Sequence, residues 1–200
     1  MAAVLAIPAC SGSAPAPPRP SPAPSSAPAS EPGLTSVTGK ASRGTFIVLE
    51  PTTPRQFPVP NAPVVMDQLG KQFIPAVLVA RAGQPVEFRN SEDIPHNVYV
   101  IRRRTGTEVF NVSTDPSQKY VHAFDQPGQY DVSCDIHLGM LASVFVITTP
   151  YAAVADEQGS FAILNVSPGS YRMVASYGEK NAERTVEVAG SHIDIGNSGV

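Results

Sequence analysis

A thiolate, an imidazole and a thioether lie within one short stretch of this chain. Cys134, His137 and Met140 follow one another at intervals of three residues, after an alternating stretch typical of a β-strand. Cys134 can therefore point into a β-sandwich near its rim, with His137 and Met140 on a tight loop beside it. A second imidazole is available from His96, at the start of another predicted strand. Two imidazoles, one thiolate and a weak axial thioether are the ligands of a type 1 copper site.

Other interpretations of these residues are weaker because of their joint spacing. A structural zinc site would prefer a further Cys or His to the Met. Taken singly, Cys134 could be a small buried hydrophobic residue, His96 a surface or capping residue, and Met140 part of the core. Together they would require several coincidences of spacing. His122 and His192 have no matching flanking residues, and we expect both to be structural or exposed.

Two local patterns around these residues resemble the plastocyanin and amicyanin branch of the cupredoxins. Residues 88–98 read F-x-N-x-x-x-x-P-H-N-V, and residues 127–137 read P-G-x-Y-x-x-x-C-x-x-H. The C-x2-H-x2-M spacing is similar to the short amicyanin-type loop. The resemblance covers roughly Val64 to Thr148. It implies a single type 1 copper ion with the ligands His96, Cys134, His137 and Met140. It also implies that Asn97 braces the two ligand-bearing loops by hydrogen bonds.

The same resemblance implies single-electron transfer with copper cycling between Cu(II) and Cu(I), and no enzymatic activity. Electrons would pass through the exposed edge of His137, where redox partner proteins would dock on a small apolar rim. We expect a monomer. Copper storage or delivery with the same ligands is the alternative function. An oxidase or nitrite reductase would need further histidine-rich copper centres, and the chain has only four histidines.

The composition and the short apolar segments predict an all-β fold. Charged residues make up 16% of the chain and the net charge is −3, so there is no basic excess to indicate nucleic-acid binding. The 21 prolines argue against long helices. Short β-branched segments are separated by Gly, Pro and Asn, as in a sandwich or barrel. Within this all-β pattern, the resemblance to cupredoxins implies a Greek-key β-sandwich at residues 64–148.

The turn sequences in the C-terminal region predict a second, smaller β-sandwich. Residues 156–161 read D-E-Q-G-S-F and residues 168–171 read P-G-S-Y. These turns resemble the carboxypeptidase regulatory-like (transthyretin-type) family. Residues 34–63 could supply the first strands of this sandwich and residues 149–200 the remainder, with the cupredoxin inserted between them. The alternative is a single cupredoxin from Thr35 to Thr148 with a short β appendage.

The N-terminal residues predict export. Residues 1–10 end in Ile-Pro-Ala-Cys and resemble a bacterial lipoprotein signal, which implies lipidation of Cys10 and a periplasmic or membrane-anchored protein. Residues 11–33 are rich in Pro, Ala and Ser and are predicted to be a disordered linker. The alternatives are an ordinary disordered tail, or a disulfide between Cys10 and Cys134. No segment has the roughly 20 apolar residues that cross a bilayer.

Overall fold

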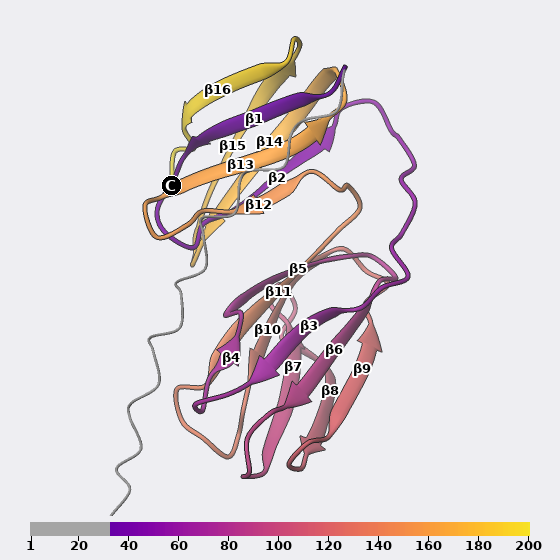
Figure 1. The fold of residues 1–200 in the computed structure, drawn as a ribbon, viewed down its shortest axis with the longest axis vertical. Coiled ribbons are helices and arrows are strands. Elements are labelled where there is room, and N and C mark those ends of the chain that lie inside the picture. Colours follow the sequence, from indigo (N-terminus) through magenta and orange to yellow (C-terminus); the bar gives the residue numbers. More distant parts are fainter. Residues whose placement is uncertain (1–32) are drawn as a thin grey trace, which may run out of the picture.

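The computed structural model describes residues 33–200, which form sixteen β-strands arranged in two sandwiches (Figure 1). This part of the chain contains no α-helix, so the predicted all-β fold class is confirmed. It accordingly has no helix with the length and apolar character needed to span a membrane. The predicted lipoprotein signal, Cys10 and nearly all of the predicted linker lie outside the described residues.

The first sandwich is formed by the middle of the chain. One sheet has the strand order β5-β11-β10-β7-β8 and the facing sheet has the order β4-β3-β6-β9. Apolar side chains that alternate along these strands meet between the two sheets, and Phe88, Val98, Val132 and Val144 are among those buried there. The strands are β3 (Val64–Gln68), β4 (Phe73–Ile74), β5 (Val77–Arg81), β6 (Pro85–Asn90), β7 (His96–Arg102), β8 (Thr107–Thr114), β9 (Lys119–Ala123), β10 (Gly128–Ser133) and β11 (Leu141–Ile147).

The second sandwich combines strands from both ends of the described chain. One sheet has the order β13-β1-β16 and the other has the order β12-β2-β14-β15. Residues 64–147 therefore lie in sequence between β2 and β12 of the second sandwich, with short linkers on either side. The strands are β1 (Thr35–Lys40), β2 (Phe46–Pro51), β12 (Ala152–Val154), β13 (Ser160–Val166), β14 (Gly169–Tyr177), β15 (Lys180–Val188) and β16 (His192–Asn197).

A third apolar core joins the two sandwiches. Phe46 and Val48 project from the outer face of β2, and Phe145 and Ile147 project from the outer face of β11. The rings of Phe46 and Phe145 stack with their centroids 4.0 Å apart. The alternate residues of both strands point into their own sandwich cores. Residues 46–49 of β2 and residues 144–147 of β11 are therefore buried on both faces, which explains why these segments are apolar throughout.

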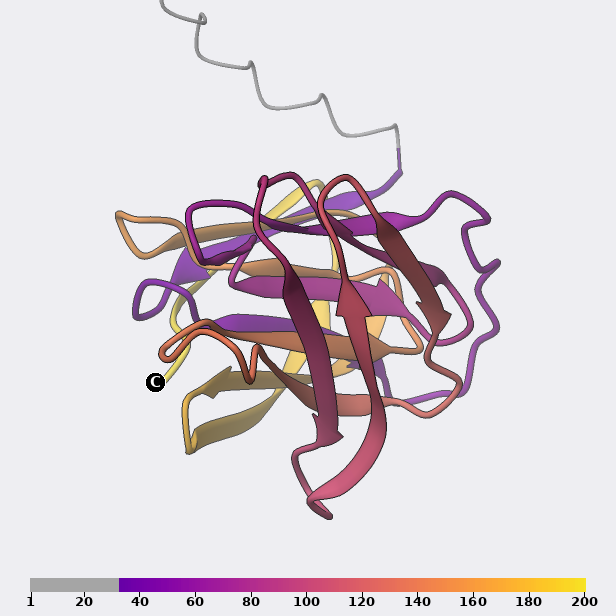
Figure 2. The same ribbon diagram turned by 90° about the horizontal axis from the view of Figure 1, so that it is seen from below.

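Polar contacts reinforce this junction beside the linkers. The buried guanidinium of Arg81 donates to the carbonyl oxygen of Thr148 at 2.7 Å and lies over the ring of Phe57, so it contacts both linkers. Arg103 forms ion pairs with Asp131 in its own sandwich and with Glu179 in the other. Figure 2 looks along the long axis from the side of the first sandwich, with the second sandwich behind it.

Candidate metal centre

The four predicted ligands lie at one end of the first sandwich. His96 is the first residue of β7, and Cys134 directly follows β10, which pairs with β7. The chain then makes a tight loop in which the Cys134 amide donates to the Met140 carbonyl oxygen at 3.1 Å. Strand β11 begins immediately afterwards, at Leu141, and reaches the junction with the second sandwich at its other end. The site is therefore at the end of β11 remote from that junction.

Three donor atoms converge at this end. The Cys134 Sγ lies 3.8 Å from the His96 Nδ1 and 3.7 Å from the His137 Nδ1, and the two Nδ1 atoms are 3.0 Å apart. A point equidistant from the corners of such a triangle lies about 2.0 Å from each, close to the bond lengths that imidazole and thiolate form with a small divalent metal ion. The donors are thus spaced to bind one metal ion.

Most of this centre is enclosed. The side chain of His96 is fully buried, Cys134 is 7% exposed and Met140 is 1% exposed. Met140 and Cys134 belong to the same apolar core, so the Met140 side chain is buried within the sandwich that carries the site. His137 is only partly buried and stands on the loop beside Leu138, which is fully exposed. The imidazole of His137 is therefore the ligand group that reaches towards the surface.

A carboxylate behind His96 was not anticipated from the sequence. The Oε2 atom of Glu92 lies 2.6 Å from the Nε2 atom of His96, on the side of the ring away from Cys134. Burial acts to raise the pKa of Glu92, but hydrogen bonds from the Lys71 backbone, His96 and the Gly70 backbone outweigh it and hold that pKa below its usual value. Glu92 is therefore an anionic acceptor for the His96 ring.

An amide and carboxylate network connects the two segments that carry the ligands. The Asn97 Oδ1 accepts a hydrogen bond from the amide of Asp135 at 2.7 Å, beside Cys134. The Nδ2 groups of Asn97 and Asn111 both donate to the Asp135 Oδ2, at 3.0 and 2.9 Å. The sequence indicated Asn97 for this position, whereas Asn111 and Asp135 were missed. These hydrogen bonds hold the start of β7 against the loop that follows β10.

The electrostatics of His137 favour metal binding. Desolvation lowers the pKa of His137 and the positive charge of Lys71 lowers it further, against an opposing effect of the Glu92 carboxylate. A lowered pKa keeps the imidazole neutral near pH 7, which leaves a ring nitrogen with a free electron pair for a metal ion. Both predicted imidazole ligands therefore lie in surroundings that suit coordination.

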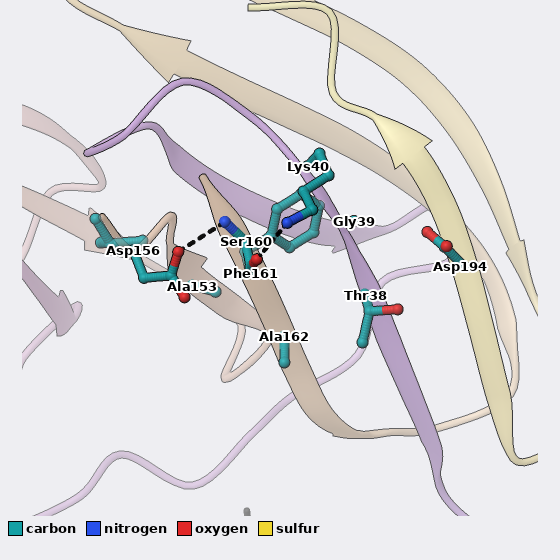
Figure 3. Close-up of a pocket in the computed structure, with 10 residues that line it drawn as sticks. Thr38, Gly39, Lys40, Ala153, Asp156, Ser160, Phe161, Ala162 and Asp194 are labelled. Carbon is teal, nitrogen blue, oxygen red and sulfur yellow. Dashed lines mark hydrogen bonds between the residues drawn. The ribbon is translucent and has the colours of Figure 1, made fainter. Parts of the chain in front are cut away.

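Two histidines and a surface hollow lie apart from this centre. The ring of His122 packs against Phe110 and Phe124, with centroids 4.8 and 4.7 Å away, and His192 is exposed on β16. Figure 3 shows an open hollow of the second sandwich, where Lys40 donates to Ser160 at 2.6 Å. The Ser160 amide donates to the Asp156 Oδ1 at 2.8 Å in the same hollow, and its polar groups form no converging set like that at the metal centre.

Comparisons with known proteins support this assignment for the first sandwich. Residues 62–147 match the family model of copper binding proteins, plastocyanin/azurin family. No curated protein sequence matches the chain. The solved structures that resemble it include a purple cupredoxin from Nitrosopumilus maritimus, at 22% identity and a TM-score of 0.37, covering 43% of this chain and 99% of that one. A reduced amicyanin variant has 23% identity and a TM-score of 0.40, covering 50% of this chain and 99% of that one.

A larger copper protein also resembles part of this chain. The copper-containing nitrite reductase of Thermus scotoductus SA-01 has 24% identity and a TM-score of 0.41. The match covers 50% of this chain and 26% of the reductase, so this chain spans about a quarter of that protein. Residues 62–147 therefore match copper binding proteins of the plastocyanin/azurin family, and the three donors that converge within this stretch indicate copper as the cofactor.

Proposed function

We propose that this protein carries single electrons through a type 1 copper centre bound by His96, Cys134 and His137, with Met140 as the weak axial ligand. The observation that carries this proposal is the convergence of one thiolate and two imidazole donors at separations of 3.0 to 3.8 Å. A buried thioether in the same core completes the donor set that type 1 copper uses.

The protein holds these donors in place by contacts that do not involve a metal. The His96 ring is held by Glu92, and the Asn97 and Asp135 pair joins the two ligand-bearing segments. A centre supported in this way changes its geometry little when its charge changes, which favours fast electron exchange. When bound, copper would supply the redox chemistry by accepting and releasing one electron.

The small exposed area of the site favours electron exchange over the conversion of a substrate. Three strong donors and one weak donor leave little open coordination, and the walls of the site are buried. We therefore propose that the domain is not an enzyme. His137 would be the point of exchange, and the exposed Ile136 and Leu138 beside it would form an apolar surface for brief contact with a redox partner protein.

Storage or delivery of copper is the second candidate function. It is favoured by the position of His137 on an exposed loop, from which one ligand could be exchanged without unfolding the sandwich. In that case the thiolate and thioether would hold Cu(I) until another protein or a chelator removed it.

Two further proposals come from the sequence. The second sandwich would be a carboxypeptidase regulatory-like module with a structural or docking role. Export, with lipidation of Cys10, would tether the protein near a membrane as a periplasmic or membrane-anchored lipoprotein.

Electrochemistry combined with a competition assay separates the two candidate functions. For an electron carrier, we expect a reversible one-electron wave in voltammetry of the copper-loaded protein. We also expect the protein to retain Cu(I) during many redox cycles in the presence of a strong Cu(I) chelator. Rapid loss of Cu(I) to the chelator, without a reversible wave, would instead support delivery and contradict electron transfer.

A further inference from the structure

The contact between Glu92 and His96 is among the shortest side-chain contacts at the metal centre. The Glu92 Oε2 is 2.6 Å from the His96 Nε2, and the His96 Nδ1 faces Cys134 and His137. Glu92 is 15% exposed and the imidazole is fully shielded from solvent. The two nitrogen atoms of this ring therefore have different surroundings, with a carboxylate on one side and the donor cluster on the other.

Glu92 is itself held by the turn between β3 and β4. The backbone amide of Gly70 donates to the Oε1 atom at 2.9 Å, and the amide of Lys71 donates to the Oε2 atom at 3.1 Å. Gly70 and Lys71 have φ angles of 65° and 54°, in the left-handed region. Successive amides in an irregular turn can form a concave site for an anion, and here the anion is the Glu92 carboxylate.

The loop that carries Glu92 is also fixed from within. The Asn90 Oδ1 accepts a hydrogen bond from the Glu92 amide at 2.9 Å. The Asn90 Nδ2 donates to the carbonyl oxygens of Ile94 and Thr114, at 2.7 and 2.9 Å. Asn90 is 2% exposed, so this support is buried. The carboxylate is consequently held by both its own loop and the opposite turn.

This arrangement has two consequences for the imidazole. A carboxylate beside Nε2 favours the tautomer with its proton on that nitrogen, which leaves the electron pair of Nδ1 for a metal ion. The negative charge also makes the imidazole a stronger donor, and it stabilises a doubly charged ion more than a singly charged one.

We propose that Glu92 is a positioning residue that fixes the ring and tautomer of His96 and lowers the reduction potential of the copper centre. This inference rests on the proposed electron-transfer function. The turn at Gly70 and Lys71 is the support through which the fold holds the carboxylate in place.

The first test compares Glu92→Gln with Asp93→Asn in the full chain. Both variants lose one negative charge at neighbouring positions, but Asp93 is exposed, whereas Glu92 contacts the His96 ring. For Glu92→Gln we expect Cu(II) affinity to fall about tenfold with Cu(I) affinity little changed. The midpoint potential should then rise by about 59 mV, which is a tenfold change for a one-electron couple. Asp93→Asn should shift the potential by much less. Equal shifts in the two variants would overturn the proposal.

The second test does not depend on copper. Nitrogen-15 NMR of the copper-free protein should show that His96 carries its proton on Nε2, and Glu92→Ala should populate both tautomers. A wild-type proton on Nδ1 would overturn the inference. A wild-type protein that binds copper without a blue band would contradict the proposed function and leave this NMR result as the decisive test of Glu92.

Discussion

The donor atoms of the metal centre are supported by neighbours that are buried or hydrogen bonded. His96 is fully buried between a carboxylate on one side and the donor cluster on the other. Cys134 continues a strand, and its amide bonds to Met140 within the same loop. A site supported in this way should form before metal binds, so substitutions of single ligands should change its chemistry more than its fold.

Substitution of Met140 tests whether this residue is a weak axial ligand of the copper ion. We expect Met140→Leu to keep the blue colour and to raise the midpoint potential, because a weak thioether that stabilises Cu(II) is lost. Leu and Met have similar volumes, so the free energy of unfolding should fall by less than about 1.5 kcal/mol. Visible spectroscopy, voltammetry and urea denaturation measure these three quantities. Loss of copper from this variant would contradict a weak axial role.

The four proposed ligands could be named from the sequence, but much of what supports them in the structure could not. His96, Cys134, His137 and Met140 lie inside local patterns whose spacing is itself informative. Glu92 is a single residue in an irregular loop, and nothing in its spacing indicates that it turns towards His96. The Glu92 carboxylate is bound by the distant turn at residues 70–71, and Asp135 is bound by Asn111 from β8. Both contacts are tertiary, so the local sequence does not indicate them.

At the scale of the elements, two strands join the sandwiches. Strands β2 and β11 have apolar residues on both faces, one set in their own core and the other at the junction. The unbroken apolar segments at residues 46–49 and 144–147 are typical of strands. Their sequence does not say which second surface covers them, since any apolar partner would satisfy the pattern. The junction could therefore not be predicted from the sequence.

The turn that leads into β13 offers a direct test of the second sandwich. Gly159 has a φ angle of 70°, and a Cβ atom there would overlap the carbonyl oxygen of Ala41. We expect Gly159→Ala to lower the free energy of unfolding by more than about 2 kcal/mol, because backbone strain and a steric clash add together. The measurement is urea denaturation of the full chain.

Gly178 provides the matched control for this substitution. It has a φ angle of 59° in the turn between β14 and β15, but a Cβ atom there would meet nothing within 4 Å. Gly178→Ala should cost about 1 to 2 kcal/mol, from the left-handed backbone alone. Equal effects of the two substitutions would show that the contact between Ala41 and Gly159 is looser than described.

At the scale of the whole molecule, the four sheets share three apolar cores, and the metal centre lies at the end of β11 remote from the second sandwich (Figure 1). The buried junction and the Arg81 contacts with both linkers connect the two sandwiches firmly. The second sandwich therefore does not cover the surface around His137.

Removal of one ring from the junction should uncouple the sandwiches. Phe145 is 8% exposed and stacks on Phe46. We expect Phe145→Ala to cost about 3 to 5 kcal/mol and to split thermal unfolding into two transitions in calorimetry, because a large buried contact is lost. The copper spectrum should not change, since this side chain points away from the metal centre.

An exposed ion pair at the same junction is the control. The Glu179 side chain is 93% exposed, so Glu179→Gln should have little effect on unfolding although it removes the pair with Arg103. A single, unshifted transition for Phe145→Ala would contradict the interpretation of the third core as the main connection between the sandwiches.

The most direct test of the central claim is the visible and electron-spin-resonance spectrum of the full chain after addition of Cu(II), with Cys134→Ser measured alongside. We predict an intense blue band and a narrow copper hyperfine splitting for the wild type, because the thiolate transfers charge to Cu(II). Both features should be absent from Cys134→Ser. A wild-type protein that stays pale with bound copper, or a Cys134→Ser variant that is equally blue, would contradict a type 1 centre built on Cys134.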